Sequence, residues 1–593
     1  MIIQALTEFY ERISSNPDYN VAPLGFEKKE LQFLIVIDKN GKFVALEDTR
    51  EKVGKKLIAK QFLVPRSLGR SGSKSYETTF LLWDHVGYLF GEPSTDPKSK
   101  KQHETWIKSL KNLPQELKED EGVSAIIKFY EQNEDKKMTS INEFNECLKA
   151  VQCNMSFRLV NDIPVPCRPA VIKFNEENAS NKNEEDSDKS SVEKNQDIIG
   201  ICLISGEKGI IARTHGRTPI NKDTKSLISF QKNSGYDSYG KEQAYNAPIT
   251  QPIEFKYVTA LNSLLKNQNQ KKQIANTTVI FWSEKETDLE NEIGALFDVP
   301  DRDDPGNNTY RIRSLFNSLQ TGAYIKDDNN SRFYILGLSP NSARISIRLW
   351  STGPIGKYAE NISQYFNEFE IVKPPKEQEF YSIWSVLDNI STQVKSDKIP
   401  PNLSGDFIKS TLEGSPYPST LFQAVLRRIK SDTKYRVKPI RGALIKAYLN
   451  RYYRFYPNQK VKEITVKLDI DQPSIGYQLG RLFAILEKIQ ETANPGLNTT
   501  IRERYYGAAC ATPVSVYPIL LKLKNHHLAK LDQKGRVIYF EKLLGEVLGK
   551  LNDFPGNLDL HEQGRFAIGY YHQRQSFFVS KEAVSSSIDN KQN

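Results

Sequence analysis

The sequence predicts an α+β protein, with a mixed α/β N-terminal and central body followed by a C-terminal helical bundle. Short apolar runs typical of strands begin with Leu31–Asp38 and Phe43–Asp48 and recur as far as Ala343–Trp350. Near the C-terminus, apolar residues instead follow one helix face, at Phe540, Leu543, Leu544, Val547, Leu548 and Leu551. At 593 residues the chain is too long for one hydrophobic core, so we expect several domains.

We assign residues 1–130 to an N-terminal domain. Its two strand-like runs are joined through Asn40-Gly41, a strong signal for a β-hairpin. A glycine-rich loop, residues 69–75, lacks the spacing of a phosphate-binding P-loop. We interpret it as a flexible basic loop that touches phosphates, and a plain solvated turn is the alternative. The basic residues between the hairpin and the end of this loop are Lys52, Lys55, Lys56, Lys60, Arg66, Arg70 and Lys74.

Residues 131–398 are predicted to form a central mixed α/β region. Within it, residues 174–197 contain mostly Asn, Glu, Asp, Ser and Lys, which predicts a disordered surface insertion. Strand-like runs follow, and in the last of them Ile345, Ile347 and Leu349 alternate with polar residues. This alternation predicts a half-buried strand with a basic outer face.

Residues 402–593 are predicted to form a helical domain. Asp559 followed by Glu562 resembles a capping box at the start of the last helix. Tyrosines accompany arginines in residues 502–506 and 565–574, a combination that suits single-stranded nucleic acid, because cations meet its phosphates and rings stack on its bases. Packing of these tyrosines in the core is the open alternative.

The composition sets limits on the class of protein. A formal charge of +10 is compatible with nucleic-acid binding without requiring it. Five scattered cysteines without a CxxC pair favour a reducing cytoplasm over disulfides or a thiolate metal site. The N-terminus does not have the pattern of a signal peptide, and no apolar run has the roughly 18 residues of a membrane helix. We therefore expect a cytoplasmic protein without membrane contact.

No pattern of catalytic residues is evident. The seven histidines form no HExxH or HxH motif, and no Ser-His-Asp or Cys-His signature stands in a suitable context. The segment Ser283-Glu284-Lys285 is only faintly nuclease-like. We expect no enzymatic activity, no metal and no cofactor.

Several segments, in order along the chain, resemble the large subunit of the type I-C CRISPR Cascade surveillance complex, of the Csd/Cas8-type large-subunit family. The resemblance runs from residue 1 to about residue 578 and depends on the set rather than on any one motif. The segments are Gly41–Arg50, Phe62–Pro65, Ser238–Gln243 with Asn246–Pro248, Phe333–Trp350, Leu479–Ala484 with Leu486–Gln490, Ile501–Ala509, His526–Leu531 and Gly564–Gln575.

The resemblance implies a non-catalytic subunit of an RNA-guided complex. Guide RNA reads the target by base pairing, while protein reads a short flanking motif, the PAM, in double-stranded DNA. The implied partners are guide RNA-bound Cascade backbone subunits, target double-stranded DNA, small-subunit copies and the helicase-nuclease effector. On the PAM side the expected contacts are Lys55, Lys56, Lys60, Arg66, Arg70, Ser71, Gly72, Ser73 and Lys74. For the displaced strand they are Arg481, Lys488, Arg502, Arg504, Arg565 and Arg574.

The chain departs from this family in two places. Members produce their C-terminal portion separately as a small subunit, which residues 466–593 resemble, but the only methionines are Met1, Met138 and Met155. A GUG start at Val466 is the alternative. The segment Lys222–Lys225 is not Ser/Gly-rich as in the family, which puts phosphate contacts by backbone amides there in doubt.

Two other functional classes stay open at this point. One is a metal-dependent nuclease that processes guide RNA or target, with carboxylates assembled from distant segments. The other is a protein-only scaffold whose positive charge is incidental.

Overall fold

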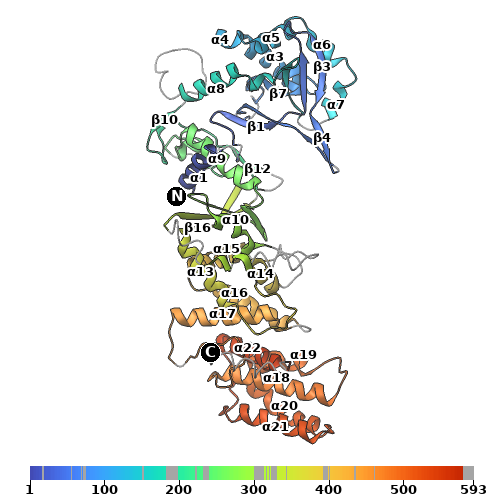
Figure 1. Cartoon of the computed structure of the whole chain (residues 1–593), viewed down its shortest axis with the longest axis vertical. Coiled ribbons are helices and arrows are strands. Elements are labelled where there is room, and N and C mark those ends of the chain that lie inside the picture. Colours follow the sequence, from blue (N-terminus) through green and yellow to red (C-terminus); the bar gives the residue numbers. More distant parts are fainter. Residues whose placement is uncertain are drawn as a thin grey trace. The chain divides into compact units, whose positions relative to one another are not determined.

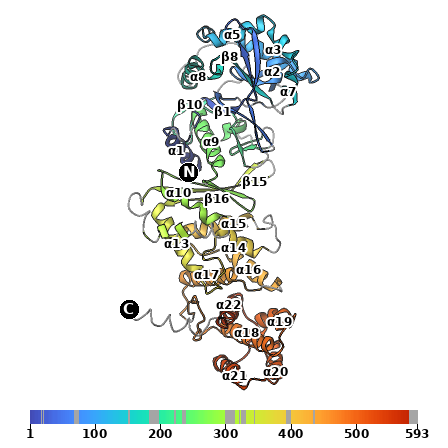
Figure 2. The ribbon, with the colours of Figure 1, turned by 45° about the vertical axis from the view of Figure 1, so that its right-hand side comes forward.

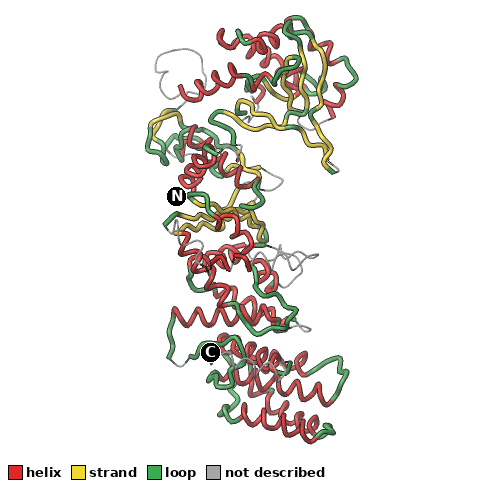
Figure 3. Tube along the Cα trace, viewed as in Figure 1, coloured by secondary structure: helices red, strands yellow, loops and turns green. Residues whose placement is uncertain are grey.

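The computed structural model describes residues 1–16, 19, 21–54, 56–67, 70, 75–149, 153–181, 198–220, 224–231, 235, 239–298, 313–315, 317–319, 321, 330–341, 344–391, 399, 401–432, 436–459 and 461–578. The chain forms two compact units, Met1–Ser263 and Leu264–Asn593 (Figures 1 and 2). Strands lie in the first unit and at the start of the second, and helices make up the rest of the second (Figure 3). The predicted α+β class is confirmed.

A four-stranded sheet in the order β3-β2-β8-β7 is the centre of the first unit. Strands β2 (Phe33–Ile37) and β3 (Phe43–Asp48) form the predicted antiparallel hairpin. Gly41 in its turn has φ +82°, and a Cβ there would lie 2.6 Å from the backbone nitrogen of Phe129. Only glycine therefore fits this turn.

The main core of the first unit lies on one face of this sheet. Phe33, Ile35 and Ile37 point to that face and pack with helices that follow β7. The alternate residue Leu34 joins a smaller cluster with Leu31, Val64 and Trp83. The elements around the sheet are β7 (Trp83–His85), α2 (Val86–Phe90), α3 (Pro97–Lys111), α4 (Gln115–Lys118), α5 (Glu121–Glu131), α6 (Glu134–Thr139), α7 (Phe144–Lys149) and β8 (Asn154–Leu159).

The first unit, Met1–Ser263, extends well beyond the N-terminal domain expected at residues 1–130. Strand β8 pairs in parallel with β2, so the sheet continues past residue 130. Helix α8 (Pro169–Asn181) includes residues 174–181, and Val171 and Phe174 near its start pack against the core. This corrects the start of the expected disordered insertion, whose remainder, 182–197, lies outside the described residues.

Short elements complete the first unit. Strands β1 (Phe26–Glu30) and β6 (Gln61–Pro65) form one antiparallel ribbon, and β4 (Arg50–Val53) and β5 (Lys56–Ala59) form another. The others are α1 (Ile2–Ser14), β9 (Ile199–Ile201), β10 (Lys208–Ile210), β11 (Arg217–Pro219), β12 (Thr224–Ser226) and α9 (Gln251–Lys266), which continues to the start of the second unit.

The second unit begins with an antiparallel sheet in the order β13-β14-β15-β16. Its bounds are β13 (Lys271–Ile274), β14 (Thr277–Ser283), β15 (Arg332–Asn341) and β16 (Arg344–Pro354). Leu349 is buried as predicted, but Ile347 is 49% exposed. A register shift separates the pairs Gly337–Leu349 and Leu338–Ile347, and it breaks the strict alternation that the sequence suggested.

Helices continue from this sheet to the C-terminus. They are α10 (Asp288–Glu292), α11 (Gly294–Phe297), α13 (Ile355–Glu368), α14 (Ile383–Ile390), α15 (Pro401–Glu413), α16 (Ser419–Ser431), α17 (Pro439–Phe455), α18 (Ile475–Ala493), α19 (Ile501–Ala511), α20 (Tyr517–Leu528), α21 (Lys534–Leu548) and α22 (Leu560–Ser576). Helix α18 contacts α19, α20, α21 and α22, and its side chains from residue 476 to 487 are all buried. It is the central helix of the C-terminal bundle.

Glycines set the close contact between α18 and α22. A Cβ at Gly480 would lie 2.0 Å from the carbonyl oxygen of Phe566, and one at Gly569 would lie 2.0 Å from that of Tyr477. The predicted cap at Asp559 is confirmed, since its side chain accepts the backbone N–H of Glu562. The Glu562 carboxylate does not complete a capping box, because it accepts the backbone N–H of Gly476 at 2.7 Å.

Candidate functional site

Within the described residues of the basic N-terminal stretch, the β4–β5 hairpin exposes two apolar side chains. Leu57 is 61% exposed and Ile58 is 44% exposed. Adjacent strand residues point to opposite faces, so the ribbon has an uncovered apolar side chain on each face. At its base, the Arg50 guanidinium donates to Asp48 at 2.7 and 2.8 Å and lies 4.5 Å from the centre of the Phe33 ring. The hairpin is therefore anchored at its base and open along its length.

Basic residues accompany this ribbon. Lys52 on β4 and Lys60 just after β5 are exposed. Lys55 and the side chain of Lys56 lie outside the described residues. Leu57 and Ile58 were not among the expected contacts. The sequence feature that could have predicted them is an apolar pair of residues between lysines, in a segment that forms short strands.

Arg66, expected on the PAM side, has a protein partner in this structure. Its Nη1 and Nη2 donate to the Glu254 carboxylate at 2.8 and 3.1 Å, and Glu254 is 4% exposed. The same carboxylate accepts the backbone N–H of Gly216. Bidentate pairing of this kind fixes the guanidinium in place, so Arg66 joins β6 to α9 within the first unit.

Arg70 is also held inside the protein. Its Nη1 donates to Oδ1 of Asp84 at 2.8 Å, its Nη2 donates to Oδ2, and its Nε donates to the carbonyl oxygen of Thr78. The guanidinium lies 3.6 Å from the centre of the Phe80 ring and 3.9 Å from that of Tyr88. Asp84 is fully buried, and burial raises its pKa while Arg70 opposes that rise.

This geometry changes the role assigned to Arg70. A guanidinium bound to a buried carboxylate and two rings is not free to enter a DNA groove. The remaining loop contacts expected from the sequence, Ser71, Gly72, Ser73 and Lys74, lie outside the described residues. They stay a prediction.

Two of the arginines expected at the displaced strand lie close to the same buried carboxylate. Glu487 on α18 is 0% exposed and accepts the Tyr570 hydroxyl at 2.7 Å. Arg502 on α19 and Arg574 on α22 approach the same carboxylate at 3.7 and 3.5 Å. Both also pair with a second acid, Glu503 for Arg502 and Glu491 for Arg574. Their charge is largely balanced inside the bundle.

Two further arginines of this group are buried. Arg481 is 0% exposed and donates to Gln573, to Gln478 and to the carboxylate of Glu546. Arg565 is 2% exposed and pairs with Glu562 at 3.3 Å. Neither side chain is accessible to nucleic acid in this structure.

Three of the four tyrosines expected at this surface are buried too, and Tyr505 is partly buried. Tyr506, Tyr570 and Tyr571 are at most 5% exposed and belong to the core of the second unit. Of the predicted displaced-strand residues, Arg504 is exposed and Lys488 is partly exposed, with its ammonium 3.5 Å from Glu491. The basic aromatic surface expected from residues 502–574 is therefore mostly interior.

A buried histidine and the carboxylate near the faintly nuclease-like segment both have structural partners. Burial lowers the pKa of His572 to about 3, and its ring contacts the Tyr477 hydroxyl at 2.9 Å. Glu290, near the faintly nuclease-like segment, is buried and accepts the Ser283 hydroxyl at 2.9 Å. Within the described ranges, no group of three or more His, Cys, Asp or Glu side chains is arranged to hold a metal ion.

Comparisons with known proteins identify the family. Among the helices that the structure describes, none has both the length and the apolar character to cross a membrane. A comparison with curated proteins finds no match. One family model, described as CRISPR-associated protein (Cas_Csd1), matches residues 6–578. The match extends from the first helix through the whole C-terminal bundle, and the chain therefore belongs to the Csd1 family of CRISPR-associated proteins.

Proposed function

We propose that this chain is the DNA-binding large subunit of a type I-C CRISPR surveillance complex and acts in the cytoplasm. It recognises the PAM in double-stranded target DNA, helps to open the duplex, stabilises the displaced strand and supports recruitment of the helicase-nuclease. Its partners are guide RNA-bound backbone subunits and small-subunit copies, and it cleaves nothing itself. Family membership and the resemblance of residues 1–578 to that subunit support the proposal.

The observation that carries the proposal is the open β4–β5 hairpin. The major groove of B-DNA admits a two-stranded β-ribbon. Apolar side chains such as leucine and isoleucine separate stacked base pairs when they insert between them. On this ribbon, the exposed Leu57 and Ile58 could act as the wedge between base pairs. The exposed Lys52 and Lys60 next to them could bind the DNA phosphates.

A reconstituted complex tests this role. Leu57→Ser with Ile58→Ser is compared with Val44→Ser, a control on β3, which precedes β4 in the sequence, where the side chain is 53% exposed. Unstacking costs a few kcal/mol per base step, so we expect target opening to slow about tenfold or more with the double variant. On DNA that is already unpaired over the target, the two variants should behave alike.

Three results would contradict parts of this proposal. Equal losses on closed and pre-opened DNA would remove the wedge role of the hairpin. Target location that is unchanged in a complex without this chain would overturn the proposed function. Magnesium-dependent cleavage of guide precursor or plasmid by the purified chain would show that it is an enzyme.

A further inference from the structure

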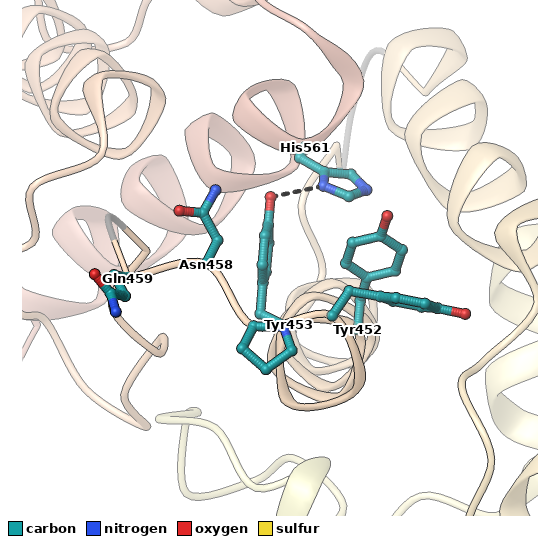
Figure 4. A pocket seen from close by; sticks show the side chains of 7 residues that line it. Tyr452, Tyr453, Asn458, Gln459 and His561 are labelled. Carbon is teal, nitrogen blue, oxygen red and sulfur yellow. Dashed lines mark hydrogen bonds between the residues drawn. The ribbon is translucent and has the colours of Figure 1, made fainter.

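The end of α17, the residues that follow it and the start of α22 border an open aromatic hollow on the protein surface. Three tyrosines, two amides, a proline and a histidine line it, and its volume is about 600 Å³. We call it the tyrosine hollow, and Figure 4 shows the side chains that line it. They are Tyr452, Tyr453, Tyr456, Pro457, Asn458, Gln459 and His561.

The rings stand at steep angles to one another. The His561 ring lies 4.7 Å from that of Tyr452 and 5.5 Å from that of Tyr453, with an interplanar angle of 77° in both pairs. The Tyr456 ring lies 4.9 Å from Tyr452. Tyr456 is 57% exposed, so one ring of the cluster is accessible from solvent.

Internal contacts hold this arrangement in place. The Tyr453 hydroxyl and Nδ1 of His561 are 2.9 Å apart, and the Tyr452 ring stacks on Tyr448 at 6.1 Å. Tyr448 in turn stacks on Phe422 at 4.3 Å. The accessible Tyr456 ring contacts Tyr452, which reaches the core through Tyr448, so the cluster needs little ordering when a ligand binds.

The charges around the hollow favour a neutral, flat ligand over a cation. No carboxylate lines the hollow, and the guanidinium of Arg565 already lies 5.1 Å from the centre of the Tyr453 ring. Burial lowers the pKa of His561, which leaves its ring neutral near pH 7. A quaternary ammonium ligand would gain the aromatic contacts, but no carboxylate of the lining would balance its charge.

We propose that the tyrosine hollow receives one unpaired base of single-stranded DNA, stacked against its accessible tyrosine ring. Base–aromatic stacking is tolerant of sequence, and the hollow falls within the roughly 300–1,000 Å³ of small-molecule sites. The amides of Asn458 and Gln459 also line the hollow (Figure 4). The inference rests on the proposed DNA-binding function and adds a site for the displaced strand.

The test compares neighbouring aromatic residues in the full chain. Tyr456→Ala removes the accessible ring, and Tyr456→Phe keeps it. Phe455→Ala is the matched control, because Phe455 is adjacent, 50% exposed and not part of the lining. Fluorescence anisotropy is measured with a labelled oligothymidine and with an abasic oligonucleotide of the same length, which keeps the phosphates but has no bases.

We expect the wild-type chain to prefer the oligothymidine, since only that probe can stack. Tyr456→Ala should weaken its binding about fivefold or more and leave abasic binding unchanged. Tyr456→Phe and Phe455→Ala should bind both probes as the wild type does. A Tyr456→Ala variant that retains the full preference, or a Phe455→Ala variant with an equal loss, would overturn the inference.

Binding of PAM-containing duplex by the assembled complex shows whether a negative result concerns this site alone or the proposed function as well. If the assembled complex still discriminates that duplex while Tyr456→Ala has no effect on the single strand, only the hollow is excluded. If the complex binds its target equally well without this chain, the proposed function fails first and the inference fails with it.

Discussion

The two basic regions of the chain use their charges in opposite ways. Between residues 50 and 60, Lys52, Lys60 and two apolar side chains are exposed on or next to a narrow ribbon. In the bundle from residue 475 to 578, Arg481 and Arg565 are almost completely buried, and Arg502 and Arg574 pair with acids around Glu487. Composition alone does not separate these cases, since both regions contain basic residues next to apolar ones.

The difference indicates which residues can contact nucleic acid at a low cost in free energy. An arginine in a buried pair leaves an uncompensated carboxylate behind if it turns outward, which costs several kcal/mol. An exposed lysine needs only to release its counterions when it meets a phosphate. The hairpin and scattered exposed cations such as Arg504 are therefore better candidates than the paired arginines of the bundle.

The substitution of Arg70 is expected to have the largest effect, a loss of stability. Arg70→Ala leaves the fully buried Asp84 without its guanidinium partner, so the free energy of unfolding should fall by about 3–5 kcal/mol. Chemical denaturation of the full chain, followed by a probe of the first unit, measures the loss. Lys60→Ala, which removes an exposed cation nearby, should change stability by less than about 0.5 kcal/mol.

This experiment also separates stability from DNA recognition at Arg70. If the Arg70→Ala variant keeps wild-type stability, the buried pair is not important for folding. In that case a direct role in the groove regains support.

Gly480 gives the next largest effect. A methyl group at this position would lie 2.0 Å from a backbone oxygen of α22, which no side-chain rotation can relieve. Gly480→Ala should destabilise the bundle by about 1–3 kcal/mol or more. Gly507→Ala on α19 is the matched control, because nothing lies within 4 Å of its added methyl, and it should stabilise the helix by up to about 1 kcal/mol. Two equal effects in thermal unfolding would contradict the close helix contact.

The sequence predicted local structure better than it predicted charge pairing. Asn40-Gly41 and the apolar stripe from Phe540 to Leu551 are local signals, and the structure has the expected hairpin and the helix α21 there. The partner of Arg70 is Asp84, and the acid between Arg502 and Arg574 is Glu487. Such pairs depend on tertiary packing, which periodicity does not encode.

One signal for the buried acid was present in the sequence. Glu487 follows Phe483 by four residues and so shares the apolar face of α18. A carboxylate on a buried face needs paired cations or hydrogen-bond donors. That requirement predicts an internal partner for some of the arginines of the bundle, although it does not identify which ones.

The smallest expected effect is a change in the salt dependence of DNA binding, and it distinguishes two arginines of α19. Arg504 is exposed with its guanidinium 5.4 Å from the Tyr505 ring, whereas Arg502 pairs with Glu487 and Glu503. If Arg504 contacts a DNA phosphate, Arg504→Ala should make the negative slope of log affinity against log salt shallower by about one and weaken all sequences alike. Arg502→Ala should leave that slope unchanged and lower stability instead, since it removes a partner of a buried carboxylate. A reversed outcome, with the slope changed by Arg502→Ala alone, would mean that the internal pair opens to bind DNA and that the contrast between the two basic regions does not hold.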